Sequence, residues 1–267
     1  MYSTYWGMKC NPFEKNINLK NTFKLDDFTQ IQSRLEYLIE KRGIGLFTGA
    51  AGLGKTYAIK YYVKNLNPSL YKIIYIPLST VTVMDFYRSI CVGLGLEVSA
   101  KKATMFIQIQ EGIKTLFKDR KITPIIILDE SQYLRTDILN DLKILFNFDM
   151  DSINMAALIL IGQPILNDIL SRQIHEPLRQ RIIVNYTLHG LDKDEMSIYL
   201  KDRLKLAGIN EDLFEKNALE ALFACINGST RKLNNLIEKC LIIGCTDEVN
   251  SINSDIVMKA ENDINLG

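Results

Sequence analysis

A glycine-rich stretch, GAAGLGKT at Gly49–Thr56, has the residue types and spacing to bind the phosphates of a nucleotide, because it fits the pattern GxxxxGK[ST]. Glycines let successive backbone N–H groups face phosphate oxygens, and the start of the following helix adds partial positive charge. Lys55 would reach the β- and γ-phosphates and Thr56 would hold Mg²⁺. The pattern predicts ATP or GTP as ligand, bound by Gly49, Ala50, Ala51, Gly52, Leu53, Gly54, Lys55, Thr56 and Tyr57. A glycine-rich turn before an ordinary helix is the alternative.

Two carboxylates follow an aliphatic run, Ile125-Ile126-Ile127-Leu128-Asp129-Glu130. This places them at the carboxyl end of a buried strand, where ligands bind in open α/β sheets. Asp129 would coordinate Mg²⁺, and Glu130 would orient and polarise the water that attacks the γ-phosphate. An aliphatic run before Asp-Glu is a weak signal alone, but downstream of the phosphate loop it becomes a strong one. Together the two motifs predict ATP hydrolysis and not only nucleotide storage.

Four more polar residues lie where a hydrolysis cycle needs them. Gln163, after another apolar run, would lie beside Glu130 and contact the γ-phosphate or the attacking water; an ordinary turn residue is the alternative. Arg179 and Arg181, in PLRQRI, precede the last predicted strand, and one of them could reach a neighbouring subunit's γ-phosphate. The other would be a surface or core-capping arginine. Arg231 opens a later helix and would close onto the nucleotide, unless it is simply exposed.

Strand-like and helix-like patterns alternate after the phosphate loop, which is typical of an α/β domain with a parallel sheet. The predicted strands are 44–48, 72–78, 125–129, 156–161 and 182–188, and helical periodicity covers 57–63, 83–92, 104–117 and 137–148. Beyond Gly190 only helices are predicted, at about 193–207, 211–225 and 230–243, the first opened by Asp192 and Glu195 as a capping box. We therefore expect a three-layer αβα sandwich with five parallel strands (residues 44–189), a leading segment (1–43) and a small all-helical lid domain (190–267).

Composition limits the class of protein. The chain has 267 residues, 47% hydrophobic and 24% charged, enough for a sizeable core. It has no apolar run long enough to cross a bilayer and no signal-peptide pattern, so we expect a cytoplasmic protein without membrane contact. The five cysteines form no CxxC pair, which argues against a zinc site. Positive charge gathers before residue 190, and six basic residues lie within 101–121; this segment could meet a polyanion or be a solvated helix face.

The motifs together resemble a known superfamily. GAAGLGKT, IIILDE, Gln163, LRQRI and GSTRKLNN follow the order of phosphate loop, acidic strand, first sensor, arginine finger and second sensor in AAA+ ATPases. The opening YWGM and NPF, with ILDESQYL, LILIGQPIL and HEPLRQRI, resemble the ExeA-like and TniB-like ATPases encoded beside bacterial transposases. In AAA+ proteins the stretch before the first strand lines the adenine pocket, which nominates Pro12 and Phe13. A turn that seals the core is an equal alternative for these two residues.

The resemblance implies an ATP-dependent homo-oligomer, a ring or a filament, that assembles on duplex DNA and directs a partner transposase. The chain ends at Gly267 without the membrane segment and cell-wall-binding region that follow this domain in ExeA, so a secretion role is not expected. By fold analogy, sequence-tolerant phosphate contacts would come from Ser79, Thr80, Thr82, Lys101 and Lys102. Two alternatives stay open: a nucleotide-switched signalling or scaffold protein without DNA, and a helicase loader.

Overall fold

The computed structural model describes residues 2–14, 22–77, 82–149, 152–209 and 212–264, and the chain divides into two compact units. The sheet unit comprises Thr29–Ala50 and Lys55–Leu188, and the helical unit comprises Met1–Phe28, Ala51–Gly54 and His189–Gly267. The first 28 residues thus group with the C-terminal helices, whereas the sequence predicted a segment leading into the sheet domain.

The sheet unit contains the five parallel strands that the sequence predicts, in the order β2-β3-β4-β1-β5. Their bounds, one or two residues from the predicted ones at most, are β1 (Ile44–Thr48), β2 (Tyr71–Pro77), β3 (Thr123–Asp129), β4 (Ala157–Gly162) and β5 (Ile182–Thr187). Because β2 lies on one side of β1 and β5 on the other, the strand order reverses at β1. Ligands of open α/β sheets bind beyond the carboxyl ends of the strands at such a point.

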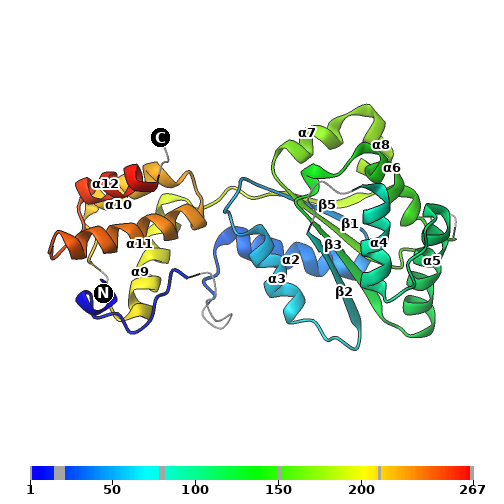
Figure 1. Cartoon of the computed structure of the whole chain (residues 1–267), viewed down its shortest axis with the longest axis horizontal. Helices are drawn as coiled ribbons and strands as arrows, with labels where there is room; N and C mark the ends of the chain where they lie inside the picture. Colours follow the sequence, from blue (N-terminus) through cyan, green and yellow to red (C-terminus); the bar gives the residue numbers. More distant parts are fainter. Residues whose placement is uncertain (1, 15–21, 78–81, 150–151, 210–211, 265–267) are drawn as a thin grey trace. The chain divides into compact units, whose positions relative to one another are not determined.

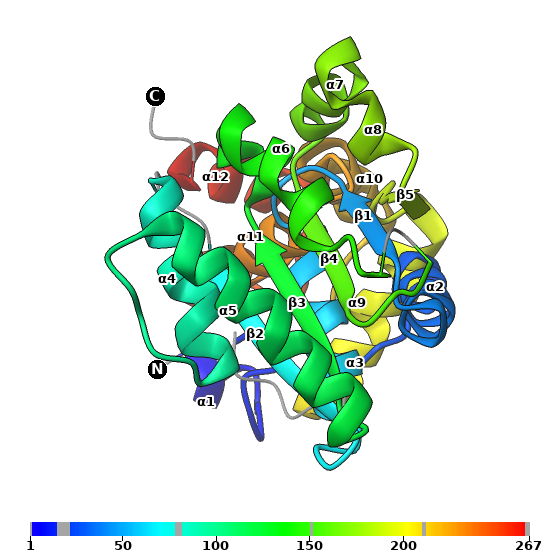
Figure 2. The same cartoon turned by 90° about the vertical axis from the view of Figure 1, so that its right-hand side faces the viewer.

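Helices cover both faces of this sheet (Figure 1). A side chain at Gly45 of β1 would lie 2.4 Å from Leu38, so α2 packs closely on one face. On the other face α4 approaches so near that a side chain at Gly93 would lie 2.4 Å from Ile74. Figure 2 shows α4 and α5 side by side. The helices of this unit are α2 (Asp26–Lys41, whose first residues belong to the helical unit), α3 (Lys55–Lys64), α4 (Val83–Leu94), α5 (Lys102–Lys114), α6 (Thr136–Leu145), α7 (Ile165–Ser171) and α8 (Glu176–Arg179).

The helical unit is held together by an apolar core to which the N-terminal segment contributes. Phe13 is buried among side chains of α9 to α12, the Trp6 indole donates to Leu241 O at 2.8 Å, and the Tyr2 hydroxyl donates to Glu238 at 2.8 Å. Burial, followed by the contact with Glu238, raises the pKa of Tyr2 to about 12. The helices are α1 (Tyr2–Tyr5), α9 (Lys193–Ala207), α10 (Lys216–Ile226), α11 (Thr230–Thr246) and α12 (Ser254–Ile264). An all-helical C-terminal part was predicted and is confirmed.

Local capping explains where several helices begin and end. The predicted capping box is present at α9, where Asp192 accepts from the Glu195 amide and Glu195 reaches back to the Asp192 amide. That helix ends at Gly208, whose φ of 78° is a left-handed conformation that glycine adopts without strain. The Thr82 hydroxyl caps α4 in the same way as Asp192 caps α9.

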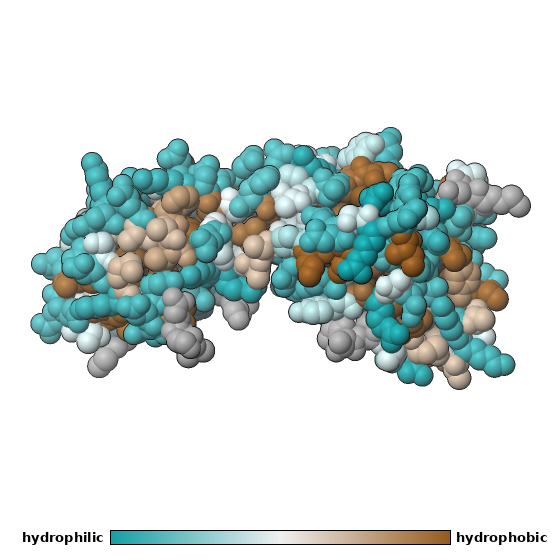
Figure 3. All heavy atoms as spheres, turned by 90° about the horizontal axis from the view of Figure 1, so that it is seen from above, coloured by the Kyte–Doolittle hydropathy of each residue, from teal (hydrophilic) through white to brown (hydrophobic). Residues whose placement is uncertain are grey.

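The surface is mostly hydrophilic on the face drawn in Figure 3, where hydrophobic residues lie in separate groups. Among the described residues, no helix combines the length and the apolar character that a membrane span requires.

Candidate active site

The phosphate loop leaves β1 at the carboxyl edge of the sheet, and its start is held firmly. Thr48, the last residue of β1, is fully buried, and its hydroxyl lies 2.9 Å from both the Thr187 hydroxyl and the Asn167 amide nitrogen. The next amide, of Gly49, donates to Gly162 O at the end of β4. The loop therefore begins between the ends of three neighbouring strands, β4, β1 and β5.

Two glycines give this loop its shape. Gly52 and Gly54 have φ values of 84° and 91°, which other residues adopt only with strain, and a side chain at Gly54 would meet nothing within 4 Å. The Lys55 ammonium donates to Gly49 O at 2.7 Å and Ala50 O at 2.8 Å, so it lies against the loop's own backbone. This open glycine cradle with an ammonium group inside it fits a polyphosphate.

The two predicted metal ligands are in contact. The Thr56 hydroxyl, in the first turn of α3, donates to Asp129 Oδ2 at 2.8 Å, and Asp129 is almost completely buried. Hydroxyl and carboxylate oxygens are the ligands that Mg²⁺ prefers. The geometry brings together residues 73 positions apart in the sequence, as the motif spacing predicts.

A third group, Tyr75, was not predicted from the sequence. Its hydroxyl also donates to Asp129 Oδ2 at 2.8 Å, from the edge strand β2. Tyr75 pairs with Ile127, so it lies on the same sheet face as Asp129, two residues further along β3. Burial and the neighbouring Asp129 carboxylate raise the pKa of this phenol above its ordinary value. Tyr75 therefore stays a hydrogen-bond donor to Asp129 at neutral pH.

Glu130 follows Asp129 in an unusual backbone conformation. Its φ of 57° and ψ of 39° are left-handed, which costs a non-glycine residue of order 1–3 kcal/mol. The turn is fixed because the Glu130 amide donates to Asp129 Oδ1 at 2.9 Å and the buried Ser131 hydroxyl donates to Leu128 O at 2.8 Å. The exposed Glu130 side chain accepts from Gln132 Nε2 at 2.6 Å, and the Gln163 amide donates to Gln132 Oε1 at 3.1 Å. Glu130 and the start of the Gln163 segment are thus neighbours.

The two arginines before β5 both contact backbone carbonyls of the sheet unit. Arg179 donates to Ser171 O at 2.8 Å and lines a cavity of about 300 Å³ together with Asn167 and Asn185. Arg181 donates to the carbonyl of Lys143 in α6. That one of these arginines serves a neighbouring subunit stays a prediction.

Arg231 lies near the middle of the phosphate loop, inside the helical unit. Its amide donates to Gly52 O at 3.1 Å, and a side chain at Gly52 would lie 2.3 Å from Ser229 Oγ and 3.0 Å from Arg231 Cβ. Position 52 therefore needs glycine both for its positive φ and for the close approach of α11. The two residues nominated for the adenine, Pro12 and Phe13, are buried, Phe13 in the core of the helical unit, and their adenine contact stays a prediction.

Of the residues nominated for DNA contacts, the ones that the structure describes have their described contacts elsewhere in the sheet unit. Ser79 and Thr80 lie outside the described residues, and the Thr82 hydroxyl caps α4. The Lys102 ammonium forms an ion pair with Asp141. The described hydrogen bonds of Lys101 involve its backbone: the amide donates to Ser99 Oγ and the carbonyl accepts from the Met105 amide.

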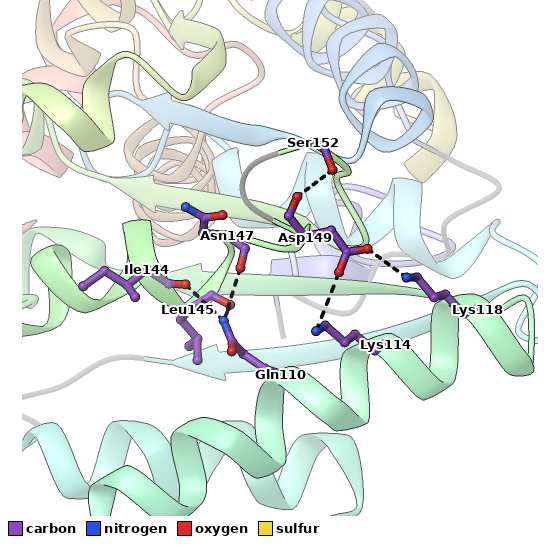
Figure 4. A network of polar contacts seen from close by, with 8 residues as sticks. All are labelled: Gln110, Lys114, Lys118, Ile144, Leu145, Asn147, Asp149 and Ser152. Carbon is purple, nitrogen blue, oxygen red and sulfur yellow. Dashed lines mark hydrogen bonds and ion pairs between the residues drawn. The ribbon is translucent and has the colours of Figure 1, made fainter.

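Part of the basic segment 101–121 stabilises the fold (Figure 4). Lys114 and Lys118 both approach Asp149, with Nζ–Oδ distances of 3.7 Å and 2.8 Å, and nearby Gln110 donates to backbone carbonyls at 3.2–3.5 Å. The hydrogen bond from Lys118 lowers the pKa of Asp149. Because α5 leads into the amino end of β3, these two lysines lie towards the sheet edge opposite the phosphate loop. Three of the six basic residues, counting Lys102, are therefore in ion pairs.

Comparison with known proteins identifies the fold. Residues 38–170 match a protein family described as "AAA domain". The chain is 28% identical over 245 residues to General secretion pathway protein A of Aeromonas hydrophila; the match covers 91% of this chain but only 44% of that protein. The chain thus spans less than half the length of that relative.

Two solved structures from Aeropyrum pernix are similar at 16% identity, and each comparison covers 96% of this chain. The ORC2 protein, solved as ADPNP-ADP complexes, gives a TM-score of 0.68 over 72% of its chain. The ORC1 protein in complex with DNA gives 0.67 over 70% of its chain. These likenesses cover both the strands and the C-terminal helices. Residues 38–170 are therefore similar to an AAA domain, and the chain has the fold of the P-loop AAA+ proteins.

Proposed function

We propose that this chain hydrolyses ATP at the carboxyl edge of its sheet. The observation that carries the proposal is the contact between Thr56 and Asp129 at 2.8 Å, with Glu130 directly after Asp129. Lys55 and the loop amides would bind the β- and γ-phosphates, and Glu130 would orient the attacking water and accept its proton. Gln163, beside Glu130, would contact the γ-phosphate.

The residues present fit both ATP and Mg²⁺. The glycine cradle accommodates phosphate oxygens, and the Thr56 and Asp129 oxygens suit a hard cation. When bound, Mg²⁺ would neutralise part of the charge that develops on the phosphates. Asp129 already accepts three hydrogen bonds, from Thr56, Tyr75 and the Glu130 amide, which fix the orientation of its carboxylate.

The proposal extends to duplex DNA and to a homo-oligomer that assembles on it under control of ATP. Its supports are the excess of basic residues before residue 190 and the similarity to an ORC1 protein solved in complex with DNA. Arg181 or Arg179 would complete the site of the adjacent subunit, and Lys101 and Lys102 would contact DNA phosphates. The motif resemblance to ATPases encoded beside transposases makes a transposase the proposed partner.

The test measures ATP turnover with and without duplex DNA, at low and at physiological salt. We expect Mg²⁺-dependent turnover that duplex DNA stimulates, and DNA binding that weakens steeply with salt. Glu130→Gln should still bind ATP but hydrolyse it on the order of 100-fold more slowly. The lifetime of the DNA-bound oligomer should increase as a result. A wild-type protein that neither turns over ATP nor binds DNA at low salt would contradict the proposal.

A secretion-associated ATPase is a second candidate, because the chain is similar to General secretion pathway protein A of Aeromonas hydrophila. ATP turnover that duplex DNA leaves unchanged, with no DNA binding at low salt, would favour this candidate or a protein-only switch. Preference for single-stranded over duplex DNA would favour a helicase loader.

A further inference from the structure

The side chain of Gln132 connects the ends of two neighbouring strands. Its Nε2 donates to Glu130 Oε2 at 2.6 Å, just beyond β3, and its Oε1 accepts from the Gln163 amide at 3.1 Å, just beyond β4. Both contacts fix which end of the amide is oxygen, because a flipped amide would set its NH₂ against an N–H and its oxygen against a carboxylate. Gln132 is therefore held in one orientation by two groups of the candidate active site.

The surrounding backbone is built to admit this side chain. Gly162, the last residue of β4, leaves the space that Gln132 occupies: a side chain at 162 would lie 2.9 Å from Gln132 Oε1 and 2.8 Å from Leu166. The left-handed conformation of Glu130 and the buried Ser131 fix the turn that carries Gln132. The glycine at position 162 and the left-handed residue at position 130 thus both allow Gln132 to contact Glu130 and the Gln163 amide.

Glu130 needs such a restraint. Its side chain is exposed, and a long carboxylate on a fixed backbone still has several rotamers. Hydrolysis requires one of them, because a misplacement of about 1 Å can cost on the order of 100-fold in rate. The hydrogen bond from Gln132 selects among these rotamers, while the other end of Gln132 holds the backbone of Gln163.

We propose that Gln132 is a positioning residue that orients Glu130 and couples it to the strand end carrying Gln163. The inference rests on the proposed ATP hydrolysis and adds a residue that acts through Glu130 without touching ATP. A displacement of the Gln163 segment by the γ-phosphate would then be transmitted to the carboxylate that activates water.

The test compares two substitutions of similar length in the full chain. Gln132→Met removes both hydrogen bonds, and Gln132→Glu keeps an oxygen for the Gln163 amide but places a second carboxylate against Glu130. We expect Gln132→Met to lower kcat about 10-fold or more and Gln132→Glu to lower it further, with the KM for ATP within about twofold of the wild type. Gln110→Met is the matched control: its hydrogen bonds lie at the opposite sheet edge, so it should lower thermal stability and leave kcat unchanged.

A double-mutant cycle separates positioning from a general structural role. In the Glu130→Gln background, Gln132→Met should reduce single-turnover hydrolysis by less than about twofold, because its effect passes through Glu130. A kcat for Gln132→Met within twofold of the wild type, or an equal loss of rate in both backgrounds, would overturn the role of Gln132 and leave the proposed ATP hydrolysis standing. Absence of ATP turnover in the wild type would overturn the proposed function and this inference with it.

Discussion

The sequence predicts ligand binding both at the phosphate-loop edge of the sheet and in the basic segment 101–121, but the side chains of the two regions make different kinds of contact. At the loop edge, Thr56, Asp129 and Glu130 come together from separate motifs, and an additional residue, Tyr75, joins them. In the basic segment, Lys114 and Lys118 share Asp149, and Lys102 pairs with Asp141. The order and spacing of the motifs correctly predicted that Thr56 and Asp129 lie together. A count of charges along the segment did not reveal which lysines form ion pairs within the protein.

The largest expected effect comes from removing the phosphate-binding ammonium. Lys55→Ala should weaken ATP binding by on the order of 100-fold or more, because a charge-assisted contact to phosphate is lost inside a preformed loop. Titration with a fluorescent ATP analogue measures this effect. Lys60→Ala, an exposed lysine on the same helix, is the control and should bind as the wild type does. Equal weakening by both would mean that general charge and not the loop geometry governs binding.

An intermediate effect is expected at Tyr75. Tyr75→Phe removes one hydrogen bond to Asp129 while keeping the ring, so the Asp129 carboxylate is less well oriented. We expect the Mg²⁺ concentration for half-maximal turnover to rise about tenfold, the lower end of the range for second-sphere partners of metal ligands. Tyr71→Phe, at the other end of the same strand, is the control. An unchanged Mg²⁺ dependence would show that Asp129 needs no support from β2.

The smallest effect is expected in the basic segment. Asp149→Asn should slightly lower thermal stability at neutral pH and leave ATP turnover unchanged. Since contact with Lys118 lowers the pKa of Asp149, its stabilisation is fully present above the unfolded pKa of about 3.9 and is lost as the pH falls through the lowered folded pKa. The difference between thermal melts of both proteins, measured between pH 3 and 7, should therefore shrink towards the acid end. A constant difference over that range would assign the effect to packing and not to charge.

Within the same basic segment, the proposed DNA binding predicts a different effect for Lys101 than for Arg120. Lys101→Ala should weaken duplex binding similarly for all sequences and reduce the salt slope by about one unit if it contacts a phosphate. Arg120→Ala, also exposed and in the same segment, is the matched control. Identical losses from both would indicate attraction by overall charge and no defined contact.

The inner strands β1, β3 and β4 could be predicted from sequence because they are largely aliphatic and buried, as inner parallel strands require. Helix α2 was not predicted, although Phe28, Ile31, Leu35 and Leu38 have helical spacing and are buried in it. Helix α12 was also missed, and α10 begins five residues later than predicted, at Lys216. Helices α2 and α12 both carry clear amphipathic periodicity, so the sequence itself is sufficient to predict them.

The site residues that sequence reasoning missed depend on register and turn geometry. Tyr75 reaches Asp129 only because β2 pairs with β3 so that Tyr75 lies opposite Ile127, and nothing local to β2 specifies that pairing. Gln132 bridges Glu130 and Gln163 only because Glu130 is left-handed and position 162 is glycine. Such contacts follow from three-dimensional placement and not from residue type.

The close contact between Asp27 and the backbone at 189–190 has a consequence for dissecting the chain. The Asp27 carboxylate accepts from the His189 amide at 3.0 Å and the Gly190 amide at 2.8 Å, so the points where the chain leaves and re-enters the helical unit are adjacent. The helical unit is therefore a discontinuous domain, and the sheet unit is inserted between residues 28 and 189, with Ala51–Gly54 of the helical unit inside that insertion. A short linker from residue 28 to residue 189 could bypass that insertion, whereas deleting the first 28 residues would remove part of the helical unit's own core.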